Sequence, residues 1–463
     1  MSDTPLQVVI LAAGQGKRMR SALPKVLHPI GGRPLIGHAL ATATSLLAHV
    51  GSKARPVLVY GHGGEQLQAA LADVECQWSH QVAQRGTGDA VAAALPLIEP
   101  VGRVLILCGD VPLLRERTLH ALLDTPVESL AILTALVDDP TGYGRILRDG
   151  AGAVQAIIEQ RDANADQRAV REVNTGTLLI PGPRLAGWLG RLNAGNAQGE
   201  LYLTDIVAMA VADGVPVLGV PAASEAEIMG INDRSQLARC EREFQRRQAE
   251  RLLEAGVTLR DPARLDVRGE VSTGQDVEID INVILDGSVE LADGVRIGAH
   301  CILRNAVVQA GVQILPYSHI DGARIGPGAV VGPYARLRPG TVLAADVHVG
   351  NFVEVKNSQL AQGAKANHLS YLGDADIGAR VNIGAGTITC NYDGANKHRT
   401  QVGDDAFIGS NASLVAPVSV GEGATIGAGS VISREAPAGA LTVTRGPQRT
   451  VRGWQRPRKK RSE

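Results

Sequence analysis

The sequence predicts a Rossmann-like α/β domain, a linking α-helix and then a parallel β-helix of hexapeptide repeats. Apolar strands alternate with amphipathic helices up to about residue 220, which is typical of a mostly parallel sheet covered on both faces. One charged helical segment follows, and aliphatic residues then recur every six positions. We expect a first domain at 1–232, a helical linker at 233–256 and a β-helix domain at 257–463.

Strands and helices alternate along the first domain. The expected strands are Val8–Ala12, Val57–Tyr60, Val104–Leu107, Ala131–Val137, Val154–Ile158, Thr177–Ile180 and Val215–Val220. The expected helices include Pro34–Leu47, Gly88–Leu97 and Thr204–Ala212. Because ligands of such sheets bind beyond the carboxyl ends of the strands, the segments after Ala12 and Leu107 are candidate sites.

Residues 233–255 form the predicted linking helix. Its apolar residues recur at steps close to three or four, and its other faces are charged. These apolar residues are Leu237, Cys240, Phe244, Leu252 and Leu253. Asp233 is the expected N-cap, and Gly256 is the expected stop.

A six-residue period marks the second domain. Aliphatic residues stand at every sixth position from Ile325 to Val355 and again from Val402 to Ile432. In a parallel β-helix each six-residue face is a short strand with one aliphatic side chain pointing inward. Two off-register segments, 361–376 and 389–400, are expected to leave the coil as loops, where functional residues are often found.

Length and composition agree with this organisation. A chain of 463 residues is too long for one hydrophobic core, so two or three domains are expected. The 54 glycines and the 3% aromatic content favour a repetitive β architecture over a β-sandwich. A net charge of −1 argues against binding to nucleic acid.

The sequence shows no feature typical of secretion, membrane insertion or a cysteine metal site. No basic leader precedes an apolar stretch at the N-terminus, and no run of about 18 apolar residues is present. The five cysteines are scattered without a Cys-x-x-Cys pair, which favours neither a zinc site nor a disulfide framework. We therefore expect a cytoplasmic protein with reduced thiols.

The loop after the first strand is a candidate phosphate site. Small residues around Gly14 let backbone N–H groups approach a phosphate chain, while Arg18 and Lys25 supply positive charge. The spacing is not that of a P-loop, because no Ser or Thr follows Lys17. It also lacks the third Gly of the dinucleotide fingerprint.

Asp110 and Asn232 are candidate ligands of Mg²⁺. Asp110 stands at the tip of the strand 104–107, and a nucleotide-bound Mg²⁺ needs only one or two protein ligands. Asn232 precedes the linking helix and offers an amide oxygen as a second ligand. The alternative for Asp110 is an ordinary turn residue.

Two further groups in the first domain suit a base and a sugar. Gln81, Gly86 and Thr87 form a Gly-rich turn at a helix start, which can read a uracil edge or hold an oxyanion. An N-cap by Thr87 explains that segment equally well. Residues at strand ends that suit sugar hydroxyls are Gly144, Glu159 and Asn174.

A polar set gathers in the β-helix domain, which a structural scaffold does not need. Its members include Arg338, Glu354, Lys356, His368, Tyr371 and Asn382. His368 is a natural general base at neutral pH, and Glu354 is expected to hold its tautomer. A lone loop histidine is more often inert, but the surrounding cations match a phosphorylated amino sugar.

Together these motifs resemble the GlmU family of bifunctional enzymes over essentially the whole chain. The first-domain residues are similar to those of sugar-phosphate nucleotidylyltransferases. The motifs His-Leu-x-Tyr-Leu-Gly-Asp from His368 and Asn-Ile-Gly-Ala-Gly-Thr-Ile-Thr-Cys-Asn-Tyr-Asp-Gly from Asn382 are typical of the family. The resemblance implies glucosamine-1-phosphate N-acetyltransferase and N-acetylglucosamine-1-phosphate uridylyltransferase activities. Their product, UDP-N-acetylglucosamine, is a precursor of peptidoglycan and lipopolysaccharide.

The resemblance also implies a left-handed β-helix, a homotrimer, and the use of UTP with Mg²⁺ and of acetyl-CoA. Lys25 and Arg18 would neutralise charge, because a sugar phosphate is already anionic and needs no base. His368 would take a proton from the glucosamine amine as it attacks the thioester, so His368 and Glu354 complete the expected catalytic residues.

The resemblance implies a set of binding residues for each substrate. Contacts to UTP or the UDP-sugar are implied for Leu11, Ala12, Ala13, Gly14, Lys25, Gln81, Gly86, Thr87, Cys108, Gly109, Asp110, Gly144, Glu159, Asn174 and Asn232. Mg²⁺ is assigned to Asp110 and Asn232. Glucosamine-1-phosphate is assigned to Arg338, Lys356, Tyr371 and Asn382. Acetyl-CoA or the developing oxyanion is assigned to Ala385, Asn391, Tyr392, Ser410, Ala428 and Arg445.

Three positions depart from the family pattern. The family commonly has Thr at Lys17 and Tyr at Cys108 and Leu201, which puts details of the sugar pocket in question. The basic segment 456–461 is interpreted as a solvated terminus rather than an anion-binding patch.

Two alternative functions stay open from the sequence. One is a single-activity nucleotidylyltransferase whose β-helix serves only assembly or regulation. The other is a β-helix binding module with a degenerate first domain, against which the presence of Lys25 and Asp110 argues.

Overall fold

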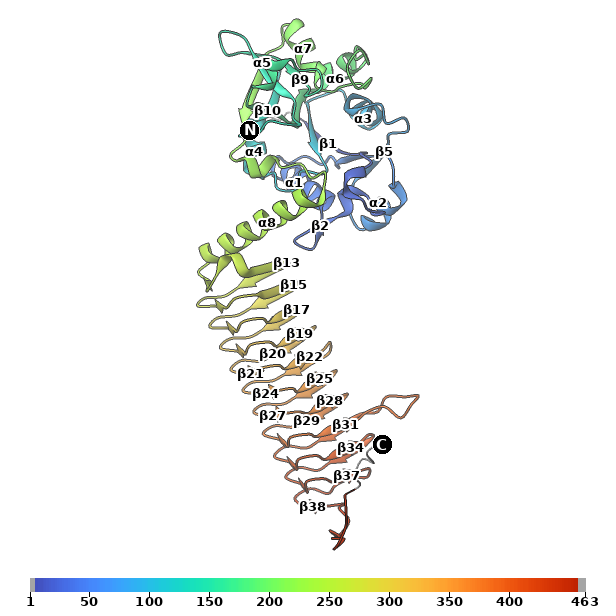
Figure 1. Ribbon diagram of the computed structural model, residues 1–463, viewed down its shortest axis with the longest axis vertical. Helices are drawn as coiled ribbons and strands as arrows, with labels where there is room; N and C mark the ends of the chain where they lie inside the picture. The colour runs from blue at the N-terminus through green and yellow to red at the C-terminus, as the bar shows by residue number, and fades with distance from the viewer. Residues whose placement is uncertain (1–4, 457–463) are drawn as a thin grey trace, which may run out of the picture. The chain divides into compact units, whose positions relative to one another are not determined.

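The computed structural model describes residues 5–456 and divides the chain into two compact units, Met1–Arg246 and Arg247–Glu463 (Figure 1). The boundary falls inside the long helix α8 (Arg234–Glu254), which was predicted as a separate linker. The basic segment predicted at the C-terminus lies outside the described residues from position 457 onward.

The first unit is built on a mixed sheet with the strand order β11-β7-β10-β6-β1-β4-β5. These strands are β1 (Leu6–Ala12), β4 (Val57–Tyr60), β5 (Gln77–His80), β6 (Arg103–Cys108), β7 (Leu130–Leu136), β10 (Glu172–Pro181) and β11 (Val217–Pro221). All pairs are parallel except those of β10, which runs antiparallel to both β6 and β7. A hairpin of β8 (Arg145–Arg148) and β9 (Val154–Ile158) joins β10.

Helices cover both faces of this sheet (Figure 1). The buried strand residues alternate between two clusters, with Val8 and Ile10 in one and Val9 in the other. The first cluster contains side chains of α1 (Leu35–His49), α2 (Gly64–Ala70) and α4 (Glu116–Leu123). The second contains side chains of α3 (Thr87–Ala94), α6 (Gly182–Leu189) and α7 (Asp205–Ala212).

All seven predicted strands of this unit are present, with ends shifted by a few residues. The sequence did not reveal β5, because its residues Gln-Trp-Ser-His lack the apolar run of a buried strand. The antiparallel direction of β10 was also missed, since an apolar run looks the same in either direction.

The helix α8 has the predicted ends. The side chain of Asp233 accepts a hydrogen bond from the backbone N–H of Gln236 at 2.8 Å, as an N-cap does. Gly256 stops the helix with a φ of +90°. Cys240 packs in a core cluster of the first unit, and Leu252 packs in the core of the second. The predicted apolar face is wrong at Leu253, which is 43% exposed.

The second unit is a parallel β-helix whose short strands stack coil upon coil down to β38 (Leu441–Thr442) (Figure 1). Its first coils contain the longest strands, β13 (Leu265–Thr273), β15 (Val283–Leu291) and β17 (Ile302–Val308). The predicted aliphatic positions face inward and are buried, as at Ile325 and Val331.

The prediction that 361–376 leaves the coil is wrong. This segment contains β27 (Lys365–His368) and β28 (Tyr371–Gly373) and the start of β29 (Ala375–Ile377), all in register with neighbouring coils. Ala366 takes the inward position at 0% exposure, and the next inward residues, Leu372 and Ile377, are five apart rather than six. A small inward residue and a shortened step therefore hid the repeat.

The second predicted loop is confirmed in its central part. Residues 391–399 lie between β31 (Ile388–Cys390) and β32 (Thr400–Val402) and contain only an isolated bridge from Tyr392 to Lys397. The ends of the predicted segment, at 389–390 and 400, stay in the coil.

Candidate active sites

A cavity of about 290 Å³ lies at the carboxyl ends of β1 and β6, where the sequence predicted a phosphate site. Its lining residues are Leu11, Ala12, Ala13, Gly14, Lys25, Val26, Gln81, Gln84, Gly86, Thr87, Ala90, Cys108, Asp110 and Glu200. Most residues predicted for nucleotide binding are therefore brought together. Gln84 and Glu200 were not predicted, and Arg18 is exposed in the adjoining loop without lining the cavity.

Lys25 is the central charge of this cavity. Its ammonium forms an ion pair with the carboxylate of Asp110 and donates a hydrogen bond to Oδ1 of Asn232 at 3.2 Å. Only 10% of the Lys25 side chain is exposed. Two oxygens from distant parts of the chain thus converge on one cation position, although Asn232 follows Asp110 by more than a hundred residues.

Gly16 places Lys25 at the cavity. A Cβ atom at Gly16 would lie 2.6 Å from Cβ of Lys25, and the residue has a φ of +60°. Both features favour glycine, because a side chain here would displace Lys25 and strain the backbone. Gly14 has open space where a Cβ would stand, so its backbone stays accessible from the cavity.

The turn at the start of α3 is held by hydrogen bonds to a distant loop. The backbone N–H of Gly88 donates to the carbonyl of Leu201 at 2.8 Å, and the Thr87 hydroxyl accepts from the N–H of Leu203 at 3.0 Å. Thr87 is therefore the first helical residue rather than the N-cap, which is Gly86. Because Leu201 acts here through its backbone, its departure from the family pattern leaves this turn intact.

The expected sugar-binding residues lie beside one another next to β10. The backbone N–H of Asn174 donates to the carbonyl of Gly144 at 2.8 Å, and a Cβ at Gly144 would lie 3.4 Å from the Glu159 carboxylate. Burial raises the pKa of Glu159, although a hydrogen bond from the Thr204 hydroxyl at 3.0 Å opposes this. No sequence pattern pointed to Thr204.

Cys108 lies between the phosphate cavity and these sugar-binding candidates. Its thiol lines the cavity and is 3.8 Å from the carbonyl oxygen of Gly176. Burial, strengthened by the negative charge of Asp110, raises the pKa of Cys108 to about 12. A neutral small side chain thus occupies the position where the family commonly has an aromatic ring.

In the second unit, His368 is exposed at the end of β27. Its Nδ1 lies 3.0 Å from Oδ1 of Asn351, which is 17 residues earlier and directly opposite in the neighbouring coil. With Asn351 as the acceptor, Nδ1 carries the proton and Nε2 keeps a free lone pair.

The predicted pairing of Glu354 with His368 is wrong. Glu354 stands opposite Tyr371 of β28, whereas His368 belongs to β27. The carboxylate of Glu354 forms an ion pair with the guanidinium of Arg338 at 2.9 Å. Arg336 lies 3.5 Å from its other oxygen. The coil register therefore gives His368 an amide partner and gives Glu354 two cations.

A cluster of charges surrounds the buried Asp374. Burial opposes its ionisation, but hydrogen bonds from Asn357 and Asn391 and the charges of Lys356 and Lys397 together lower the pKa of Asp374. Close approach to the Lys356 ammonium lowers the pKa of Lys397. Two neighbouring ammonium groups form a site for an anion, and Lys397 was not predicted.

The residues expected to contact acetyl-CoA form a column near the C-terminal end of the unit. Ala385 accepts a hydrogen bond from the backbone of the next coil, and Ser410 does the same one coil later, at 2.8 Å each. Ala428 and Arg445 continue the column. Gly429, next to Ala428, lies beside Arg445, because a Cβ atom built on Gly429 would be 3.8 Å from Cδ of Arg445. Tyr392 is exposed in the loop 391–399, with its hydroxyl donating to Gly394.

The number of residues per coil could have identified Asn351 as the partner of His368 from the sequence. Residues 17 positions apart lie opposite each other in the coils around His368, as for Asn351 with His368 and Glu354 with Tyr371. The offset is 18 residues in the preceding coil, as for Arg336 with Glu354, so a residue number plus 17 or 18 predicts the neighbour in the next coil where no loop intervenes. No comparable rule predicts Thr204 or Glu200, because they come from loops of irregular length.

Three family models match parts of the chain. A MobA-like NTP transferase domain matches residues 8–173, a GMPPB C-terminal domain matches 267–362, and a bacterial transferase hexapeptide model of six repeats matches 399–434. The hexapeptide match and the stacked parallel coils together identify the second unit as a left-handed β-helix of hexapeptide repeats. None of the described helices has the length and apolar character that crossing a bilayer requires.

Curated relatives match over almost the full chain. "Bifunctional protein GlmU" of Stutzerimonas stutzeri is 58% identical, covering 98% of this chain and 100% of the relative. The proteins of the same name from Aromatoleum aromaticum and Ralstonia nicotianae are 57% and 55% identical, each covering 99% of this chain and 100% of the relative. The chain therefore belongs to the GlmU family of bifunctional transferases, with a nucleotidyltransferase domain followed by a hexapeptide acyltransferase domain.

Proposed function

We propose that the chain makes UDP-N-acetylglucosamine by two successive transfers onto one sugar phosphate. Acetyl-CoA first gives its acetyl group to the amine of glucosamine-1-phosphate, and coenzyme A leaves. A phosphate oxygen of the N-acetylated product then attacks the α-phosphorus of UTP, and pyrophosphate leaves. The observation that carries the proposal is that each unit brings together groups suited to its reaction. Lys25 meets Asp110 in the first unit, and the second unit contains both the His368–Asn351 pair and the neighbouring Lys356 and Lys397.

For uridylyl transfer, the residues of the chain bind and orient two anions. The attacking phosphate is already ionised at neutral pH, so positioning and charge neutralisation lower the barrier without a general base. Lys25 and Arg18 supply positive charge toward the triphosphate. Glu159 and Asn174 hold sugar hydroxyls, and the backbone around Gly14 approaches the phosphates.

Asp110 and Asn232 fit a magnesium ion. A carboxylate and an amide oxygen are ligands that Mg²⁺ accepts, and both already converge on the Lys25 ammonium. Mg²⁺ bound there would offset the negative charge of the triphosphate and of the departing pyrophosphate.

For acetyl transfer, His368 accepts the proton that the sugar amine loses on attacking the thioester carbon. Asn351 holds the ring in the tautomer that leaves Nε2 free. Lys356, with Arg338, Tyr371 and Asn382, binds the sugar phosphate, while acetyl-CoA lies along the column that contains Ser410 and Ala428. The buried Asn391 donates a hydrogen bond to Asp374, which lies beside Lys356.

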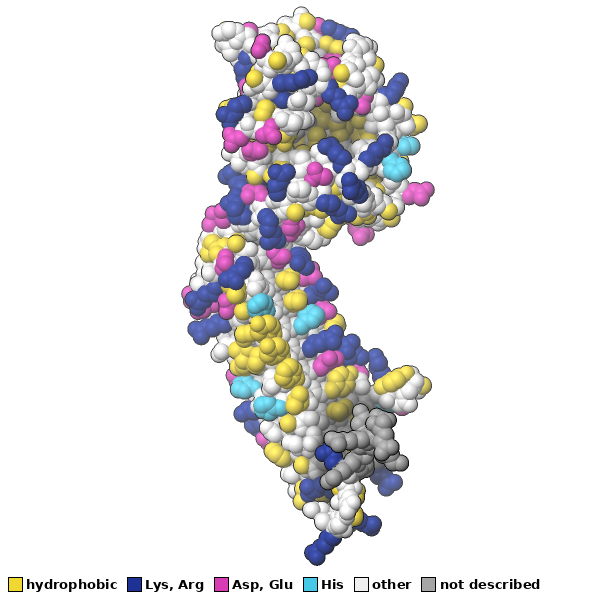
Figure 2. Space-filling model, viewed as in Figure 1, with side chains coloured by type: hydrophobic (Ala, Val, Ile, Leu, Met, Phe, Trp, Pro, Cys, Tyr) yellow, Lys and Arg dark blue, Asp and Glu magenta, His cyan; other side chains and the backbone are white. Residues whose placement is uncertain are grey.

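We also propose that the chain works as a cytoplasmic homotrimer. A ladder of stacked rings, His300, Tyr317, Tyr334 and Phe352, runs along one corner of the β-helix, with centroids 4.8 to 5.3 Å apart. Phe352 is 56% exposed and Leu369 is 62% exposed. Figure 2 shows hydrophobic side chains gathered on the surface of this unit, which favours contact with a second copy.

One reaction mixture tests the proposed function. The purified chain is incubated with glucosamine-1-phosphate, acetyl-CoA, UTP and Mg²⁺, and UDP-N-acetylglucosamine is sought by mass spectrometry. Formation of this product supports both activities. If the product forms only from N-acetylglucosamine-1-phosphate, the β-helix is a scaffold and the single-activity alternative holds. If UTP is never consumed, the proposal for the first unit is wrong.

A further inference from the structure

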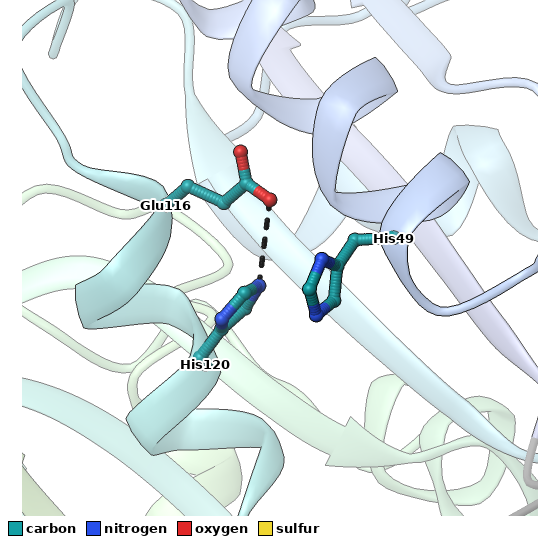
Figure 3. A group of neighbouring side chains, drawn as sticks. All are labelled: His49, Glu116 and His120. Atoms are coloured by element: carbon teal, nitrogen blue, oxygen red, sulfur yellow. Dashed lines mark ion pairs between the residues drawn. The ribbon is translucent and has the colours of Figure 1, made fainter. Parts of the chain in front are cut away.

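A second cluster of ligand-type side chains lies in the first unit, where α1 packs near α4. His49 is the last residue of α1, while Glu116 and His120 stand one helical turn apart on α4. One potential ligand atom from each of the three side chains lies within 4.8 Å of the other two. Figure 3 shows the three side chains pointing toward one another from the two helices, and none of them lines the cavity at the strand ends.

One nitrogen of this cluster has no hydrogen-bond partner. Nε2 of His120 is shielded from solvent and has no hydrogen-bond partner. It lies 3.4 Å from Oε1 of Glu116, and the rings of His49 and His120 have centroids 4.3 Å apart. A shielded nitrogen that makes no hydrogen bond is unfavourable, and a cation held between it and the Glu116 carboxylate would give both groups a partner.

We propose that His49, Glu116 and His120 bind a divalent transition-metal cation, with Zn²⁺ as the best match. Two imidazoles and one carboxylate are a ligand set that Zn²⁺ accepts, at bond lengths of about 2.0–2.2 Å. Such bonds place tetrahedral ligand atoms about 3.4 Å apart, the separation already found between His120 and Glu116. The third ligand atom lies within 4.8 Å of the other two, and the exposed side chain of His49 is free to approach them.

The surroundings support the cluster as a metal site. The Ser45 hydroxyl donates a 2.6 Å hydrogen bond to Oε2 of Glu116, which orients the carboxylate and leaves Oε1 for a cation. His49 and His120 also line a cavity of about 520 Å³, which gives a path for entry and space for a fourth ligand from solvent.

Metal binding here would join the end of α1 to α4. Both helices contribute to the same core cluster on one face of the sheet, so a cation that binds only the folded unit stabilises it. The site does not depend on either transfer reaction, since none of the three residues belongs to the proposed active sites.

Zinc binding to the full chain tests this proposal. Chelator-treated protein is titrated with Zn²⁺ in excess Mg²⁺, and bound zinc and the melting temperature are measured for the wild type and for His49→Gln and Glu116→Gln. His62→Gln is the matched control, because His62 is another exposed histidine of the same unit. We expect the wild type and the control to bind one more Zn²⁺ per chain than the two cluster variants. Their melting temperature should also rise by a few degrees with zinc.

A second probe reports on the ligands themselves. Co²⁺ in the same site should give the visible absorption of a tetrahedral complex in the wild type and the control, but not in His49→Gln. Equal zinc stoichiometry and equal thermal shifts in all four proteins would overturn the proposal. So would a cobalt spectrum that His49→Gln leaves unchanged.

Discussion

The two candidate active sites differ in how far the residues of one chain enclose them from solvent. The first is a cavity at the strand ends, where Lys25 is 10% exposed and contacts two oxygens of its own unit. The second lies on the outer surface of the β-helix, where His368 and Tyr392 are exposed. Strand ends surrounded by loops desolvate charges by themselves, whereas a stack of regular coils presents its polar side chains to solvent. We expect a site of the second kind to be enclosed by a neighbouring chain.

The largest expected effect comes from removing the base of the open site. His368→Ala should lower the rate of acetyl transfer by about 10³-fold, the range of general base catalysis, and leave uridylyl transfer unchanged. Release of the coenzyme A thiol and release of pyrophosphate measure the two reactions separately.

A matched control for this substitution is His348→Ala, because His348 lies on β24 (His348–Asn351) in the same unit. We expect that control to keep both activities. Full acetyl transfer by His368→Ala would show that another group is the base.

A somewhat smaller effect is expected at the enclosed site. Lys25→Met keeps most of the side-chain volume but removes the charge, and should lower uridylyl transfer by about 10²–10³-fold while acetyl transfer persists. Lys17→Met, in the same loop but exposed and outside the cavity lining, should change the rate by less than about tenfold. Similar losses in both variants would mean that general positive charge, rather than the Lys25 position, matters.

Enclosure of the first site also predicts the reactivity of its thiol. Because burial raises the pKa of Cys108 to about 12, the native protein should alkylate there at least about 10²-fold more slowly at pH 8 than the urea-unfolded chain does. Peptide mass spectrometry after timed iodoacetamide treatment measures this rate. Equal rates in the two states would mean that the cavity is open at Cys108.

The same shift has a consequence for stability at high pH. The pKa of Cys108 in the folded state lies above that of an exposed thiol, so the folded state holds this proton more tightly. The stabilisation by the protonated thiol is complete below about pH 9 and is lost as the pH rises toward about 12.

The smallest expected effect tests whether a neighbouring chain completes the open site. Phe352→Asp places a charge on the exposed aromatic ladder at a residue with φ of +56°, which Asp tolerates. We expect weaker trimer formation in light scattering and about tenfold slower acetyl transfer at low protein concentration. Uridylyl transfer serves as the internal control and should not change. A monomeric variant with full acetyl transfer would show that one chain suffices.

Local sequence patterns predicted some elements of the fold correctly and one segment wrongly. The apolar run of β1 and the six-residue period around Ile325 predicted their elements, because burial repeats with the geometry of a strand or coil. The segment 361–376 was misread because its coil has a five-residue step and a buried alanine. Periods identify a repeat only while the spacing is kept.

In the candidate sites, the reactive residues were predicted from the sequence, but their contacts were not. Residue types alone pointed to Lys25, Asp110 and His368, since phosphates need cations and proton transfer needs a group that titrates near neutral pH. They did not identify the partner of His368, and Glu354 was the wrong choice. A carboxylate is the stronger partner in principle, but the coil register places an amide beside the ring.

Local sequence patterns were enough to predict the two architectures, their order along the chain and the charged or titratable residues that carry the chemistry. These follow from local patterns of burial and from the properties of single side chains. The folded structure was needed to show the antiparallel direction of β10, the pairing of His368 with Asn351 and the meeting of His49 with Glu116 and His120. Such contacts depend on strand direction, coil length and helix packing, and these bring together residues whose separation along the chain carries no local signal.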